Sequence, residues 1–125
     1  MPEARILIVE DEILIAEDLR LLLQRMGYQV VGTASSGAEA IRKAGQLHPD
    51  LVLMDVRLQG AMDGIETARQ IRKTANIPII YVTAHASVLA SLEEDRCTRL
   101  AKPFSPSQLQ SAINGVLGDP PKQTQ

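Results

Sequence analysis

Residues 6–11 are Ile6-Leu7-Ile8-Val9-Glu10-Asp11, an apolar run that ends on two acids. The run is short, rich in β-branched side chains and apolar at every position, which is typical of a strand buried on both faces of a parallel sheet. Three later runs have the same form, and each ends before a polar residue. They are Leu51-Val52-Leu53-Met54 before Asp55, Ile79-Ile80-Tyr81-Val82 before Thr83, and Leu100-Ala101 before Lys102.

The polar residues that end these runs predict a site as well as a fold. In a parallel sheet the carboxyl ends of all strands lie along one edge, and open α/β sheets bind their ligands just outside that edge. We therefore expect three carboxylates, one hydroxyl and one ammonium to lie together: Glu10, Asp11, Asp55, Thr83 and Lys102.

Helical patterns alternate with the strand-like runs. Apolar spacing predicts helices over residues 12–26 and 86–95, and Tyr28 to Thr33 has the pattern of a further strand. Three more helices are expected after capping sequences, which are Ser36-x-x-Glu39, Asp63-x-x-Glu66 and Ser105-Pro106-Ser107-Gln108.

Strict alternation of strands and helices predicts parallel strands joined by right-handed crossovers. With five strands, the simplest arrangement is a flavodoxin-like, doubly wound α/β fold: a five-stranded parallel sheet in the order 2-1-3-4-5 with helices on both faces. In that order the crevice lies between the first and third strands. Glu10 and Asp11 would then meet Asp55 at the crevice.

Composition and charge narrow the class of protein. A chain of 125 residues, 45% hydrophobic and 22% charged, fits one globular domain, which we expect over residues 1–118, followed by a tail or linker over residues 119–125. A net charge of -2 does not indicate binding to nucleic acid or to an anionic membrane surface. The single cysteine, Cys97, excludes an internal disulfide and a zinc site built on several cysteines. No secretory signal or membrane span is recognisable, so a cytoplasmic location is expected.

The acidic cluster indicates phosphoryl chemistry. Three packed carboxylates repel one another, and Lys102 offsets only one of the charges. Mg²⁺ suits the remaining excess, because it binds through a few carboxylates and keeps waters that a phosphate can replace. An aspartate beside Mg²⁺ is a competent nucleophile toward a phosphoryl group.

Four segments together resemble the receiver domain of two-component response regulators. They are Val9-Glu10-Asp11-Glu12, Leu53-Met54-Asp55-Val56, Val82-Thr83-Ala84 and Lys102-Pro103-Phe104. The resemblance spans about residues 4–118, with the segments in the family's order on the expected strand ends. It implies that the peptide bond between Lys102 and Pro103 is cis.

The resemblance also implies a role for each site residue. Asp55 resembles the phospho-acceptor, and Glu10 and Asp11 resemble the Mg²⁺ acids, with Glu10 acting through water. The backbone carbonyl of Arg57 resembles the third protein ligand of the metal. Thr83 resembles the hydroxyl that turns toward the phosphoryl group, and Lys102 resembles the ion-pair partner of that group.

These roles imply a phosphorelay signalling module rather than an enzyme that turns over an external substrate. It would take a phosphoryl group from a histidine kinase or phosphotransfer protein onto Asp55, catalyse that transfer and its own dephosphorylation, and act on an output partner or domain of unidentified kind. No nucleic-acid or membrane partner is expected for this domain.

One residue and one segment depart from the family pattern. Receivers usually carry an aromatic residue three positions before the lysine, where this chain has Arg99, and the span from Thr83 to Lys102 is short. Burying a guanidinium is costly, so Arg99 is predicted to stay at the surface. We expect the helix at 86–95 to be short or poorly ordered, and we expect a switch in which phosphorylation orders the segment after Thr83.

Three other functions compete with this interpretation. A degenerate receiver that only binds proteins is favoured by Arg99 but opposed by the complete set of acids, threonine and lysine. A phosphatase acting through an aspartyl-phosphate would place an acid at position 57, where this chain has Arg57. A flavin carrier of the same fold would place a phosphate-binding loop where this chain has Glu10-Asp11-Glu12.

Overall fold

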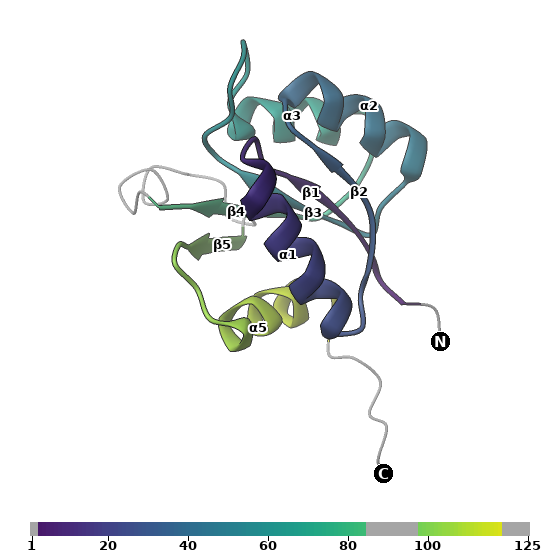
Figure 1. Ribbon diagram of the computed structural model, residues 1–125. Coiled ribbons are helices and arrows are strands. Elements are labelled where there is room, and N and C mark those ends of the chain that lie inside the picture. The colour runs from purple at the N-terminus through teal and green to yellow at the C-terminus, as the bar shows by residue number, and fades with distance from the viewer. Residues whose placement is uncertain (1–2, 85–97, 119–125) are drawn as a thin grey trace.

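The structure is a computed structural model, and it describes residues 3–84 and 98–118. Strands and helices alternate along these ranges (Figure 1). The strands are β1 (Arg5–Val9), β2 (Gln29–Ala34), β3 (Leu51–Asp55), β4 (Ile79–Thr83) and β5 (Thr98–Ala101). The helices are α1 (Ile13–Arg25), α2 (Gly37–Leu47), α3 (Gly64–Thr74) and α5 (Pro106–Leu117).

All five strands are parallel and lie in the order β2-β1-β3-β4-β5, which confirms the predicted flavodoxin-like topology. The predicted boundaries differ from the observed ones by a residue or two, with α1 beginning at Ile13 and β2 ending at Ala34. The helix predicted over residues 86–95 lies outside the described residues.

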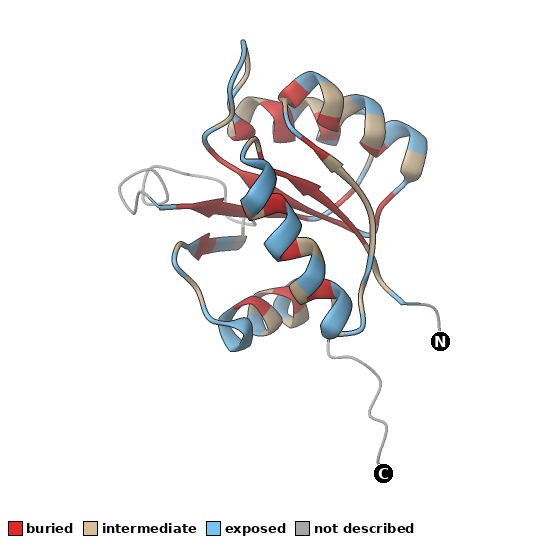
Figure 2. Cartoon of the chain, viewed as in Figure 1, coloured by how far each residue is buried: buried red, intermediate tan, exposed pale blue. Residues whose placement is uncertain are grey.

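Two helical layers cover the sheet. Figure 1 shows α2 and α3 on one face and α1 and α5 on the other. Alternate residues of each strand point to opposite faces, so Met54 and Tyr81 pack in the cluster beneath α2 and α3, and Leu53 and Ile80 pack in the cluster beneath α1 and α5. Every residue of β3 and β4 is buried, as expected for central strands covered on both faces (Figure 2).

The N-terminal caps largely follow the predicted pattern. The side chains of Ser36, Asp63 and Ser105 each accept a hydrogen bond from the backbone N–H three residues later. Ser105 and Gln108 form a reciprocal capping box.

The predicted capping box of Ser36 and Glu39 is only half correct. The Glu39 side chain accepts from the backbone N–H of Ser35, at 2.7 Å, instead of that of Ser36. It does so because Ser35 also offers its hydroxyl and Lys43 approaches the same carboxylate from the next turn.

Among the helices in the described ranges, none is long and apolar enough to cross a membrane.

Candidate functional site

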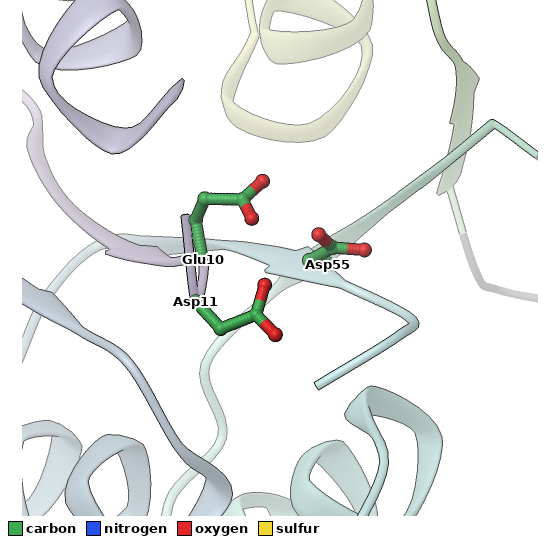
Figure 3. Close-up of side chains that lie close together, drawn as sticks. All are labelled: Glu10, Asp11 and Asp55. Atoms are coloured by element: carbon green, nitrogen blue, oxygen red, sulfur yellow. The ribbon is translucent and has the colours of Figure 1, made fainter. Parts of the chain in front are cut away.

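Three acids meet at the carboxyl edge of the sheet. Glu10 and Asp11 directly follow β1, and Asp55 is the last residue of the neighbouring strand β3. Each offers one carboxylate oxygen, and these three atoms lie within 4.8 Å of one another. Figure 3 shows Glu10 and Asp11 leaving the backbone on opposite sides, with Asp55 beside them. The predicted convergence of the three acids is therefore present.

The Glu10 side chain is held at both oxygens. The backbone N–H of Glu10 donates to the carbonyl of Ala34 at 2.9 Å, which continues the β1–β2 ladder beyond the strand. The residue is only 3% exposed. Oε1 accepts from Nζ of Lys102 at 3.0 Å, and Oε2 accepts from the backbone N–H of Glu12 at 3.1 Å. The carboxylate is thereby kept at the edge despite its burial.

Asp55 is held in the same way. The next residue, Val56, donates its N–H to the carbonyl of Val82 at 3.0 Å, which anchors the end of β3 to β4. Oδ1 of Asp55 accepts from the backbone N–H of Arg57 at 3.1 Å, and Oδ2 accepts from Nζ of Lys102 at 3.4 Å. The carboxylate therefore has a fixed orientation toward the ammonium.

Lys102 lies between the two buried acids. Its backbone N–H donates to the carbonyl of Thr83 at 2.8 Å, which joins the ends of β4 and β5. The peptide bond to Pro103 is cis, as the family resemblance implies. Burial of the ammonium lowers the pKa of Lys102, but the hydrogen bond to Glu10 and the charges of Asp55 and Glu10 outweigh it, so the pKa is raised above its ordinary value. The side chain is therefore a permanent cation at neutral pH.

Thr83 and Arg57 lie at the same edge. Thr83 ends β4 and is 1% exposed. Arg57 lies two residues beyond Asp55 with an exposed side chain, so its backbone is the part next to the site. Arg99 is exposed on β5, as predicted. Asp63 caps α3, with Oδ1 accepting from the N–H of Glu66 at 2.9 Å, which confirms the predicted cap.

The donor set fits a hard divalent cation. Three carboxylates and one ammonium leave an excess of two negative charges, and every available donor is an oxygen. Within the described residues the half-buried carboxylate of Asp11 accepts no hydrogen bond from the protein, so its lone pairs are available to a metal. Mg²⁺ has this ligand preference.

Two features near the site were not predicted from the sequence. A groove of about 550 Å³ opens beside Lys102, and its lining includes Leu19 and Leu22 of α1 and Phe104. At the start of α1, Ile13 and Leu14 are 81% and 80% exposed. The sequence did carry a signal for both features, because the run that forms α1 is rich in leucine and isoleucine on most of its faces.

Known proteins are similar to this chain in sequence. The family model of the response regulator receiver domain matches residues 6–114. The transcriptional regulatory protein PdtaR of Mycobacterium tuberculosis is 41% identical over 112 residues, which cover 87% of this chain and 54% of that protein. This chain spans about half the length of the curated relatives it matches.

Solved structures agree with the sequence matches. The signal receiver domain of a modulated diguanylate cyclase from Desulfovibrio desulfuricans superposes with a TM-score of 0.83 at 36% identity, covering 93% of this chain and 94% of that one. The anti-anti-sigma factor PhyR from Bartonella quintana has a TM-score of 0.83 at 32% identity, covering 94% of this chain and 48% of that one. The similarity therefore extends over nearly the whole chain.

Proposed function

This chain belongs to the response regulator receiver domain family, and from that premise we propose that it accepts a phosphoryl group on Asp55 from a histidine kinase or phosphotransfer protein. The observation that carries the proposal is the position of Lys102, whose ammonium contacts both Asp55 and Glu10 at 3.4 and 3.0 Å. A cation at this position can stabilise the negative charge that a phosphoryl group brings to Asp55.

The transfer needs positioning more than covalent chemistry from the protein. An oxygen of the Asp55 carboxylate attacks phosphorus, a P–O bond forms, and the bond to the donor breaks with its electron pair leaving on the donor. The N–H of Arg57 orients the carboxylate, and Lys102 offsets its charge. Dephosphorylation is the attack of water on the same phosphorus, which releases inorganic phosphate and restores the carboxylate.

Mg²⁺ would be held by the carboxylates of Glu10, Asp11 and Asp55 and by the backbone carbonyl of Arg57. When bound, the ion neutralises phosphoryl oxygens. Thr83, buried at the end of β4, is proposed to bind the phosphoryl group after transfer and to alter the conformation of the segment that follows it. On this proposal the domain catalyses its own modification and is not an enzyme acting on other substrates.

The donor is proposed to be a protein in the cytoplasm. The apolar groove beside Lys102 and the exposed Ile13 and Leu14 supply contact surface next to the acceptor. The similarity to PhyR, described as an anti-anti-sigma factor, supports a protein as the output partner as well. An alternative is a receiver that binds partners without phosphorylation, which the exposed Arg99 favours because the usual aromatic residue is missing.

Acetyl phosphate with Mg²⁺ tests the proposal. One phosphoryl group should be added per chain, detected by intact mass, and Asp55→Asn should abolish the addition. Asp50→Asn is the matched control, because Asp50 is an exposed aspartate that hydrogen-bonds the N–H of Arg5, the first residue of β1, instead of lying at the carboxyl edge. Equal labelling of the Asp55→Asn variant, or no labelling of the unaltered chain, would refute the proposal.

A further inference from the structure

Gly64, the first residue of α3, packs directly against the backbone of Asp55. A Cβ atom added at Gly64 would lie 2.9 Å from the carbonyl carbon of Asp55 and 2.9 Å from Cα of Val56, with the carbonyl oxygen of Asp55 nearer still. The N–H of Gly64 also donates to the carbonyl of Val56 at 2.8 Å. The loop from Arg57 to Asp63 is thus closed onto the residue that carries the acceptor carboxylate.

Glycine is required here by this contact, not by its backbone conformation. The φ angle of Gly64 is not positive, unlike those of Gly27, Gly60 and Gly118, so an alanine could adopt the same backbone. The atoms that a methyl group would meet belong to the main chain, which cannot rotate aside as a side chain can. Any larger residue must therefore displace either α3 or the end of β3.

We propose that Gly64 is a positioning residue for phosphoryl transfer, acting through the backbone of Asp55 and Val56. This inference rests on the function proposed above. The hydrogen bond from the Arg57 N–H to Oδ1 of Asp55 spans only this segment, so a shift of the peptide at position 55 changes where the carboxylate is directed. The proposed metal ligand, the Arg57 carbonyl, lies on the same segment and would move with it.

Gly37 supplies a matched control at the same position of another helix. It is the first residue of α2, it is buried, and a Cβ atom there would also be crowded. The atoms it would meet belong to side chains, first Oγ1 of Thr67 and then Cβ and Cε of Met62 at 3.2 Å. Gly37→Ala therefore introduces a steric conflict with side chains of the same loop and of α3, but makes no direct contact with the backbone of the acceptor.

The test compares Gly64→Ala with Gly37→Ala in a stabilised chain. Gly45→Ala and Gly115→Ala supply the background, because both glycines lie inside helices and face open space, where alanine favours the helix. Phosphorylation by acetyl phosphate with Mg²⁺ is measured per folded molecule. Gly64→Ala should slow it at least tenfold, since a displacement of about 1 Å can cost about 10²-fold in rate, while Gly37→Ala should remain within about twofold of the background.

A second readout separates positioning from stability. In metal-free protein, the amide NMR resonances of residues 55–57 and of Lys102 should shift in Gly64→Ala and stay in place in Gly37→Ala. A wild-type rate in Gly64→Ala, an equal loss in both variants, or failure of Gly64→Ala to fold in the stabilised background would each overturn the positioning role. Absence of labelling in the unaltered chain would instead refute the proposed function, and the resonances would still test the contact.

Discussion

At the scale of single residues, Lys102 offsets part of the negative charge of the acidic site. Its ammonium contacts two buried carboxylates, and its side chain is 22% exposed. Lys102→Met should still fold but lose stability, by about 1–3 kcal/mol, because Glu10 and Asp55 each lose a charged donor. Denaturant unfolding measures this loss, and Lys73→Met, on the exposed face of α3, is the control.

The pH dependence of that loss has a definite sign. Because the pKa of Lys102 is raised in the folded protein, its contribution to stability is fully present below the ordinary lysine value of about 10.4 and is lost as pH rises through the folded pKa. The stability difference between the unaltered chain and Lys102→Met should therefore be constant from about pH 7 to pH 9 and shrink only above about 10.4. A difference that disappears near neutrality would contradict the assigned charge state.

The residues of the site differ in how visible they are in the sequence. Glu10, Asp55, Thr83 and Lys102 could be predicted because a parallel sheet puts every strand's carboxyl end at one edge. Gly64 could not, since its contact with Asp55 depends on how the loop between β3 and α3 folds back. Sequence spacing carries no information about that path.

At the scale of secondary-structure elements, α2 and α5 begin with related caps that differ in charge. Glu39 accepts from the N–H of Ser35, and the neutral Gln108 accepts from the N–H of Ser105 at 2.8 Å. The hydrogen bond from Ser35, followed by that from Lys43, lowers the pKa of Glu39. Its stabilising contribution is therefore present above the ordinary glutamate value of about 4.3 and lost as pH falls through the folded pKa.

Glu39→Gln should preserve the cap and remove its pH dependence. Gln108 shows that an amide oxygen can occupy such a position, so stability at pH 7 should fall by only a few tenths of a kcal/mol, the value of exposed pairs such as that with Lys43. Thermal unfolding of both chains between about pH 3 and 7 measures the effect. Stability curves that stay parallel below about pH 4.3 would show that Glu39 contributes no pH dependence.

The same caps show what an element's sequence can predict. The three cap residues were correctly identified because the donor three positions later is fixed by helix geometry. The predicted hydrogen-bond donor to Glu39, the N–H of Ser36, was wrong because a long side chain can reach either of two adjacent N–H groups. Nearby groups such as the Ser35 hydroxyl and Lys43 then decide which one it bonds.

At the scale of the whole molecule, the fold holds three carboxylates closer than they would lie in an unfolded chain. Two helical layers and a fully buried β3 keep them there, so part of the stability of the fold offsets their repulsion. A divalent cation held by these acids, as proposed above, would bind only where this geometry exists. Mg²⁺ should therefore stabilise the folded state, by about 2.7 kcal/mol at one hundred times its Kd.

Asp11→Asn separates repulsion from metal binding. Without Mg²⁺ the variant should unfold at a higher temperature than the unaltered chain, because one of three carboxylates within 4.8 Å has lost its charge. With Mg²⁺ the order should reverse, because the variant lacks one of the proposed carboxylate ligands. Thermal unfolding with EDTA and across a Mg²⁺ series reports both effects, and Asp63→Asn, at the α3 cap, should respond to Mg²⁺ like the unaltered chain. The same Mg²⁺ response in Asp11→Asn and in the unaltered chain would mean that the acids lie together for another reason.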